Sequence, residues 1–222
     1  MKNILFIGNS FTFFSELPEM TSALANKAGD EVHIESVTFG GAYLHEFANP
    51  SHDYHKKLTE VYPNKKWDYI ILQDQSRNPA EHTEDCINAT MSLYEMMKDC
   101  GAKFLMYSTW AYKDGSTTLE STGMTYTEML TKLTDGYKKA AEAIGATCVP
   151  VGQAFARSTA EHPEIDLYDR NDFYHPHITG TYLASCLFYQ AITGKSATKL
   201  DGIEKIDPEM AEKLRNTAAE FN

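Results

Sequence analysis

Five short apolar runs with strand character alternate along this chain with stretches that have helical spacing. The runs are NILFIG (3–8), VHIESVTF (32–39), DYIILQDQ (68–75), AKFLMYST (102–109) and ATCVPV (146–151). Strands that are connected through helices run parallel, because the crossover returns the chain to the same end of the sheet. The order therefore predicts an α/β fold whose central parallel sheet has about five strands and is covered by helices on both faces.

Apolar residues at helical spacing mark the expected helices. They occupy residues 17–28, 93–100 and 129–144, each followed by a glycine that suits a helix C-terminus, and a last helix is expected over 207–221. Methionine and aromatic residues at this spacing are typical of a packed core, not of a cofactor site. The polar stretch 112–123 is expected to be a loop, either mobile beside the site or a plain surface excursion.

The length and charge of the chain limit its organisation and its partners. With 222 residues it fits a single domain, 1–222. The balance of 31 acidic against 20 basic residues gives a net charge of -11. Such a surface repels nucleic acid and anionic lipid, so we expect neither nucleic-acid nor membrane partners. A small-molecule substrate remains the expected partner, and the oligomeric state stays open.

The apolar run at residues 4–7 is shorter than the core of a signal peptide, and no stretch reaches the ~20 apolar residues of a membrane span. We expect a cytoplasmic protein, and a leader removed from the natural gene stays open. The four cysteines are widely spaced and match no paired metal-ligand pattern. They are expected to be reduced core residues, and no metal or cofactor is expected.

The first apolar run ends abruptly at Gly8-Asn9-Ser10, which delivers a hydroxyl to the carboxyl end of a strand. Open parallel sheets bind their ligands at this edge. Because a helix follows, the Ser10 hydroxyl and N–H lie where a helix N-terminus favours developing negative charge. Ser10 is therefore either a nucleophile or a capping residue of that helix, and the motif alone leaves both open.

Three further features follow strands or precede a helix. Asp172 and His175 stand three residues apart before an apolar helix that Pro176 opens, a spacing that within one helical turn lets the carboxylate orient the imidazole. A capping Asp and a helix-start His would give the same pattern. Gly40-Gly41 and the pair Gln73 and Gln75 each end a strand and offer backbone or side-chain N–H groups to an oxyanion.

With these residues in view, the chain resembles the SGNH, or GDSL-like, hydrolase superfamily of esterases and lipases. FIGNS resembles the family's Gly-Asp-Ser block with Asn9 in place of Asp, and TFGGAY resembles its glycine block. ILQDQS lies where the family carries Gly-x-Asn-Asp, and DFYHP matches the closing Asp-x-x-His-Pro. The four blocks follow the family's order over residues 8–176.

The resemblance implies a three-layer, flavodoxin-like α/β/α sandwich and a role for each matching residue. Ser10 would be the nucleophile, His175 the base and Asp172 the residue that orients it. The N–H groups of Ser10 and Gly41 would form the oxyanion hole together with a side-chain amide. The third block departs from the family, because Gln75 stands where Asn is expected and Gln73 where Gly is expected.

The most specific hypothesis is a serine esterase that removes a small acyl group, by family habit an acetyl, from a carbohydrate or similar alcohol through an acyl-enzyme. Weaker candidates for substrate contact are Asn9, Gln73, Trp110 and Tyr112, although core packing explains Trp110 and Tyr112 equally well. His177 also follows the motif, and Asp172 could in principle orient it instead of His175.

Two alternatives from other classes remain. Ser10-x-Thr12-x-x-Ser15 resembles the phosphate loop of flavodoxins, which would make the chain an FMN-binding electron carrier. Phe13 replaces a glycine of such loops, and flavin binding gives Asp172 and His175 no task. The altered third block would also fit an inactive SGNH-fold binding protein.

Overall fold

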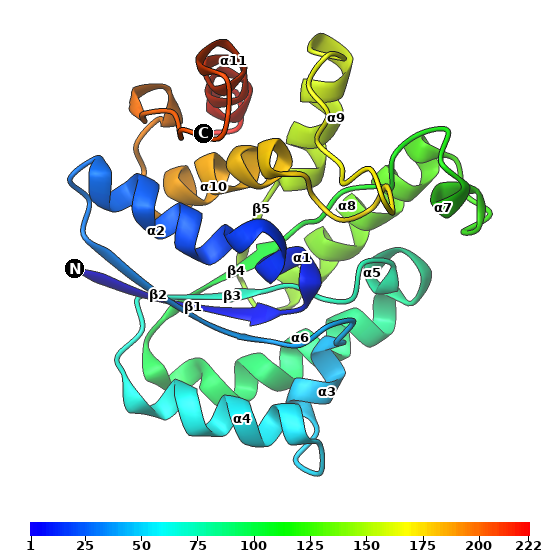
Figure 1. The fold of residues 1–222 in the computed structure, drawn as a ribbon. Helices are drawn as coiled ribbons and strands as arrows, with labels where there is room; N and C mark the ends of the chain where they lie inside the picture. The colour runs from blue at the N-terminus through cyan, green and yellow to red at the C-terminus, as the bar shows by residue number, and fades with distance from the viewer.

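The computed structural model describes residues 1–222, and its central element is a five-stranded parallel sheet (Figure 1). The strands lie in the order β2-β1-β3-β4-β5, and all neighbouring pairs are parallel. Their bounds are β1 (Lys2–Gly8), β2 (Val32–Thr38), β3 (Tyr69–Leu72), β4 (Lys103–Tyr107) and β5 (Thr147–Val149). Each predicted run contains one strand, which confirms the expected sheet.

Helices cover the sheet on both faces and make the three-layer α/β/α sandwich that the resemblance implies. One face carries α2 (Leu17–Lys27), α9 (Val151–Glu161), α10 (Ile178–Thr193) and α11 (Pro208–Ala219). The other carries α3 (Leu44–Ala48), α4 (Asp53–Val61), α6 (Thr83–Met97) and α8 (Tyr126–Ala143).

Short helices lie in the loops that connect these elements. Beyond the carboxyl ends of the strands they are α1 (Ser10–Phe13), α5 (Asn78–Glu81) and α7 (Thr117–Glu120). Single 3₁₀ turns are η1 (Phe14–Glu16), η2 (Tyr62–Asn64), η3 (Lys98–Cys100) and η4 (Ala197–Lys199).

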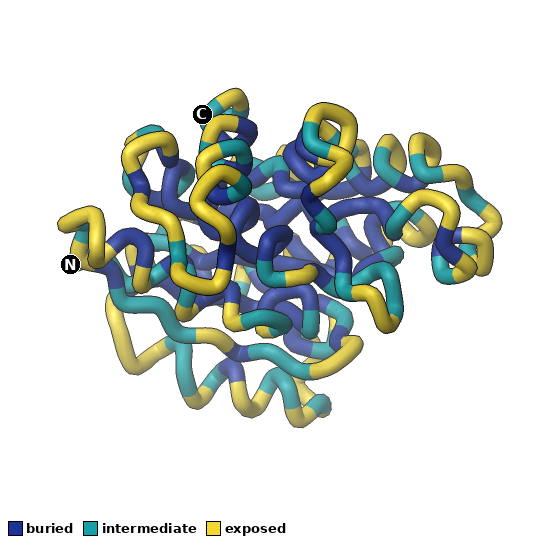
Figure 2. Tube along the Cα trace, turned by 45° about the horizontal axis from the view of Figure 1, so that its top comes forward, coloured by how far each residue is buried: buried dark blue, intermediate teal, exposed yellow.

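The apolar residues form one cluster of 56 buried side chains that spans both faces of the sheet. Ile4 to Ile7 of β1 have no exposed surface, because helices cover this central strand from both sides. Figure 2 shows the buried chain at the centre and the exposed segments around it. The rigid centre thereby holds the carboxyl ends of β1, β2 and β3 at one edge.

Gly8 ends β1 at a point where no side chain fits. A Cβ at this position would lie 2.5 Å from Gln73 Oε1 and 2.8 Å from Thr12 Oγ1. The glycine therefore allows the end of β3 and the first turn of α1 to approach the end of β1 closely. This packing places the residues after β1 and β3 side by side.

One expectation about local structure gains detail, and another needs correction. The stretch 112–123 contains helix α7, and it is tied to the segment before α10, because Lys113 N donates to Phe173 O (3.0 Å) and Thr118 Oγ1 to Asp172 O (2.8 Å). The helix after the closing block begins at Ile178, not at Pro176. Pro176 instead forms an isolated antiparallel bridge with Tyr168, and the residues directly before it form turns and bends.

None of the helices combines the length and apolar character that a membrane span requires.

All four cysteines are free; Cys86 and Cys186 are buried, and Cys100 and Cys148 are partly buried. Burial raises the pKa of the Cys186 thiol to about 12. A thiol that stays protonated is a poor nucleophile, which fits a packing role for this cysteine.

Candidate active site

Ser10 is the first residue of α1, and its neighbour Asn9 occupies the capping position. The Asn9 side chain accepts a hydrogen bond from Phe11 N at 3.1 Å, which satisfies one free N–H of the helix start. The Ser10 hydroxyl is consequently not needed as a cap. The capping interpretation of this motif therefore applies to Asn9, and Ser10 is left with its hydroxyl available for other partners.

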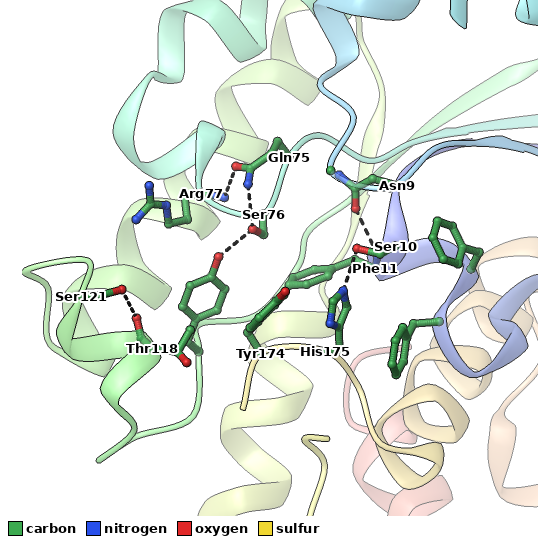
Figure 3. Close-up of a pocket in the computed structure, with 15 residues that line it drawn as sticks. Asn9, Ser10, Phe11, Gln75, Ser76, Arg77, Thr118, Ser121, Tyr174 and His175 are labelled. Carbon is green, nitrogen blue, oxygen red and sulfur yellow. Dashed lines mark hydrogen bonds between the residues drawn. The ribbon is translucent and has the colours of Figure 1, made fainter. Parts of the chain in front are cut away.

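The Ser10 hydroxyl lies in a hydrogen-bonded chain with His175 and Asp172 (Figure 3 shows the Ser10 end). His175 Nε2 is 2.7 Å from Ser10 Oγ, and His175 Nδ1 is 2.7 Å from Asp172 Oδ2. The side chain of His175 is 12% exposed and that of Asp172 is 27% exposed. Both imidazole nitrogens are thus engaged, one by the carboxylate and the other by the hydroxyl.

Asp172 and His175 lie in a loop and not on a helical turn as their spacing suggested. Asp172 Oδ1 accepts hydrogen bonds from Tyr174 N (3.0 Å) and His175 N (2.9 Å), which folds the loop around the carboxylate. Phe173 between them adopts a left-handed φ of 62°, which is uncommon for a bulky residue. The loop brings the two side chains together although the helix is absent.

The same contacts explain the charge state of Asp172. Partial burial raises the pKa of its carboxyl, but hydrogen bonds from His175 Nδ1 and two backbone N–H groups lower it by more. The pKa therefore lies below its ordinary value of 3.8. Asp172 is ionised at neutral pH and can hold His175 in the tautomer with its proton on Nδ1.

Aromatic rings enclose the His175 imidazole. Phe14 stacks on it with a centroid distance of 4.4 Å and an interplanar angle of 9°. Phe11 meets it edge-on at 5.7 Å, and Tyr174 lies at 4.2 Å with a tilted ring. These contacts restrict the rotation of the imidazole and keep Nε2 directed at Ser10.

A buried amide pair fixes the turn that presents Ser10. Gln73 Oε1 accepts from Asn9 N and from Thr12 Oγ1, each at 2.9 Å, and Gln73 Nε2 donates to Asn9 Oδ1 at 2.9 Å. Gln73 has no exposed surface. Gln73 therefore holds the turn that carries Ser10 from within the protein. It does not line the cavity, so the suggested contact between Gln73 and substrate is wrong.

The glycine loop after β2 is attached to the same network. Asn9 Nδ2 donates to Ala42 O at 2.9 Å, and the buried Asp74 carboxylate accepts from Leu44 N at 2.9 Å. Gly41 has a positive φ of 69°, which favours glycine, and its N–H has no hydrogen-bond partner in the protein. This leaves a free backbone donor at the site, beside Ser10.

The side chain of Gln75, the second glutamine after β3, is partly exposed and forms hydrogen bonds within its own loop. Its Oε1 accepts from Arg77 N at 2.9 Å, and its Nε2 donates to Ser76 Oγ at 3.2 Å. One hydrogen of Nε2 is thus used within the loop, and the other remains for a ligand.

A cavity of about 590 Å³ opens over Ser10 and His175. Its volume falls in the range of small-ligand sites, about 300–1,000 Å³. Of the predicted residues it is lined by Asn9, Ser10, Gly41, Gln75, Tyr112 and His175. The other lining residues are Phe11, Phe13, Phe14, Gly40, Ser76, Arg77, Thr118, Ser121 and Tyr174.

Trp110 lies outside this cavity, contrary to the suggestion that it contacts substrate. It is fully buried between Phe11 and Phe155, with centroid distances of 4.8 and 4.2 Å, and its Nε1 donates to Tyr174 O. Core packing is therefore its role. Tyr112 does line the cavity, and its hydroxyl bonds Ser76 Oγ at 2.7 Å.

No protein-family model matches the sequence, and no curated protein matches it either. Among solved structures, a proposed SGNH hydrolase from Slackia heliotrinireducens shares 28% identity at a TM-score of 0.77, over 86% of this chain and 98% of that one. A DUF4886 family protein from Bacteroides uniformis matches at a TM-score of 0.84 and 22% identity, over 99% and 93%. The chain has the fold of the SGNH hydrolase superfamily.

A more distant likeness is a catalytic mutant of an acetylxylan esterase from Geobacillus stearothermophilus, with a TM-score of 0.61 and 14% identity over 86% of this chain and 94% of that one. In the SGNH fold of the present chain, the four sequence blocks meet at one sheet edge. Ser10 follows β1, Gly41 follows β2, Gln75 follows β3, and His175 precedes α10.

Several residues of this candidate site were missed in the sequence. Phe14 lies only four residues after Ser10, so the sequence could have predicted that it is close to Ser10. Its stacking on His175 could not be predicted in this way. Arg77 and Tyr174 belong to loops whose fold is set by distant partners, and nothing in the sequence singled them out.

His177 lies outside the cavity, exposed, with Nδ1 3.0 Å from Thr179 Oγ1. No group of three or more His, Cys, Asp or Glu side chains is arranged to hold a metal.

Proposed function

We propose that this protein is a serine esterase of the SGNH type, with Ser10, His175 and Asp172 as its catalytic triad. The observation that carries the proposal is the hydrogen-bonded chain from Ser10 Oγ through His175 to Asp172, with 2.7 Å at each link. This is the arrangement that activates a serine hydroxyl in acyl transfer. The structural likenesses support a hydrolase, and the esterases among them support ester substrates.

Each residue of the proposed triad has a role in the reaction. Ser10 Oγ attacks the ester carbonyl carbon while its proton passes to His175 Nε2, and Asp172 stabilises the resulting imidazolium. As the tetrahedral intermediate collapses, His175 returns the proton to the leaving alcohol and the acyl group stays on Ser10. Water then attacks the acyl-enzyme with His175 as the base, which releases the acid and restores Ser10.

The oxyanion of the tetrahedral intermediate needs donors close to Ser10. As the first residue of α1, Ser10 has no partner for its N–H within the helix, and the Gly41 N–H has none in the protein. These two backbone groups are the proposed hole, with the remaining Nε2 hydrogen of Gln75 as a third donor. Such donors act where charge develops and lower the barrier directly.

For the substrate we propose a small acyl ester, acetyl first, of a carbohydrate or similar alcohol. Aromatic side chains and hydroxyl groups line the cavity, a combination that suits a sugar. Three of the similar structures, two of them variants of one enzyme from Geobacillus stearothermophilus, are described as acetyl xylan esterases at 12–15% identity, which supports the acyl preference.

Labelling of Ser10 tests this proposal. A serine-directed phosphonate should add one covalent group at Ser10, and Ser10→Ala should lower kcat on a chromogenic acetyl ester by about 10⁴-fold while the fold is retained. Mass spectrometry locates the label and circular dichroism checks the fold. A label at another residue, or a Ser10→Ala variant with full activity, would refute the assignment.

The two alternatives give different results in the same preparation. An inactive binding protein would turn over no ester of any acyl length and would resist the phosphonate. A flavodoxin-like carrier would purify yellow with bound FMN. Neither alternative gives the hydrogen bond between Ser10 and His175 a function, which is why the esterase is preferred.

A further inference from the structure

The cavity over Ser10 contains one permanently charged side chain, that of Arg77. None of the 15 lining residues is an Asp, Glu or Lys. In Figure 3 Arg77 lies on the opposite side of the cavity from Ser10 and His175, with Tyr174 between them. A cation at this place is unexpected on general grounds, because the chain as a whole has a net charge of -11.

The guanidinium of Arg77 is only weakly engaged by the protein. Its one acidic neighbour within 4 Å is Glu81, whose Oε2 lies 3.5 Å from Nε, and the Arg77 side chain is 38% exposed. Exposed ion pairs at this helical spacing contribute little to stability, so another anion can readily replace Glu81 as the partner of the guanidinium. The terminal nitrogens have no hydrogen bond to any protein group and remain available to a ligand.

The backbone of Arg77 is, in contrast, held firmly. Its N–H donates to Gln75 Oε1 at 2.9 Å, and Gln75 Nε2 bonds Ser76 Oγ, which is itself 2.7 Å from the Tyr112 hydroxyl. The loop after β3 is thus cross-linked to the wall of the cavity. This arrangement fixes where the guanidinium begins while leaving its end free, as a ligand-binding arginine requires.

We propose that Arg77 forms a carboxylate-binding subsite, and that the preferred substrate is an ester that carries a carboxylate at some distance from the reacting carbonyl. This inference rests on the proposed esterase function and names its substrate class. A planar guanidinium binds a carboxylate through two parallel hydrogen bonds. In a molecule that otherwise repels anions, Arg77 supplies the local attraction that such a substrate needs.

The test uses acetyl esters of linear hydroxy acids, the acetoxy derivatives of butanoate, hexanoate and octanoate, each compared with its neutral amide. For the length that fits, wild-type kcat/KM should be about 10- to 100-fold higher for the carboxylate than for the amide, mainly through KM. Arg77→Gln should remove this preference, so that the carboxylate and its amide are cleaved with similar kcat/KM. Arg77→Lys should keep part of it, and added salt should weaken it.

Arg157→Gln is the matched control. Arg157 is also a half-exposed arginine paired with a glutamate four residues on, Glu161, but it does not line the cavity. Its replacement should leave the carboxylate preference intact. Glu81→Gln frees the guanidinium and should lower KM for the carboxylates. If Arg77→Gln and Arg157→Gln behave alike, or carboxylates and amides are equivalent at every length, the subsite does not exist.

Calorimetry on Ser10→Ala separates this inference from the esterase proposal, because the ligands then bind without being cleaved. Tighter binding of a carboxylate than of its amide, lost on Arg77→Gln in the Ser10→Ala background, supports the subsite even if the wild-type protein cleaves no ester. Equal binding of carboxylate and amide at all three lengths overturns the subsite even if the wild-type protein is an active esterase.

Discussion

Asn9 shows how one residue leaves the hydroxyl of its neighbour, the proposed nucleophile Ser10, free for other partners. Its Oδ1 caps α1 and accepts from Gln73 Nε2, while its Nδ2 donates to Ala42 O and, at 3.3 Å, to Asp74 O. A carboxylate at position 9 would face these two carbonyl oxygens without a hydrogen to offer. The amide is therefore the side chain that this network requires, in place of the Asp found in the family's block.

At the same scale, the two histidines of the closing block should differ sharply. His175→Ala should lower kcat by about 10⁴-fold, nearly as much as Ser10→Ala, because it removes the proton acceptor at Ser10 Oγ. His177→Ala should lower kcat by less than about tenfold, since His177 lies outside the cavity. Steady-state kinetics on an acetyl ester decides, and the reverse ranking would show that His177 is the base.

The two glutamines after β3 should separate catalysis from stability. If Gln75 donates to the oxyanion, Gln75→Ala should lower kcat by about 10²–10³-fold with little change in KM. Gln73→Ala should mainly lower the free energy of unfolding, because Asn9 and Thr12 then lose a buried partner. Kinetics and denaturant unfolding measure both. An unchanged kcat for Gln75→Ala would leave a hole made of the Ser10 and Gly41 N–H groups alone.

At the scale of elements, the strands could be predicted because their signal is local. A run such as NILFIG and the helical spacing after it contain what is needed to read β1 and α2. The Asp172–His175 geometry was predicted for the wrong reason, because a separation of three residues fits both a helical turn and a loop closed by an Asp side chain. The bonds of the 113–118 segment to residues 172 and 173 also hold the loop, and such long-range bonds leave no local pattern.

The contact between β1 and β3 at Gly8 gives an element-scale prediction. Gly8→Ala should lower the free energy of unfolding by about 1–3 kcal/mol, because the added methyl overlaps Gln73 Oε1. It should also lower kcat, since the added methyl would lie 2.8 Å from Thr12 Oγ1 and displace the turn of α1 that carries Ser10. Urea unfolding and kinetics on the folded fraction measure the two effects.

Gly152→Ala is the control for this prediction. Its Cβ would lie 2.2 Å from Thr109 O, so the variant should be destabilised as well. Because Gly152 does not support the Asn9 turn, its kcat should stay close to wild type. Equal losses of kcat in both variants would mean that the effect of Gly8→Ala is general destabilisation.

At the scale of the whole molecule, an ion pair connects two loops near the site that are far apart in the sequence. Asp166 accepts from Lys113 Nζ at 2.8 Å and lies 3.3 Å from Arg170 Nε, so that it joins the segment after β4 to the segment before α10. Partial burial raises the pKa of Asp166, but the Lys113 hydrogen bond and charge lower it by more, and the pKa lies below 3.8. Asp172, in the same region, has a lowered pKa too.

These shifts fix the direction of the pH dependence. A carboxyl whose pKa is lower in the folded than in the unfolded state stabilises the fold fully above its unfolded value, about 3.9 for Asp, and loses this contribution as the pH falls through the folded value. Asp166→Asn should therefore lower Tm at neutral pH by about 2–4 °C, for a loss of about 1 kcal/mol. Below the folded pKa of Asp166 this difference in Tm should shrink.

Asp135→Asn, at an exposed aspartate of α8 without an ion pair, should match wild type at every pH in thermal melts. A constant difference in Tm between Asp166→Asn and wild type across the acid range would show that the ionised carboxylate does not hold these segments together.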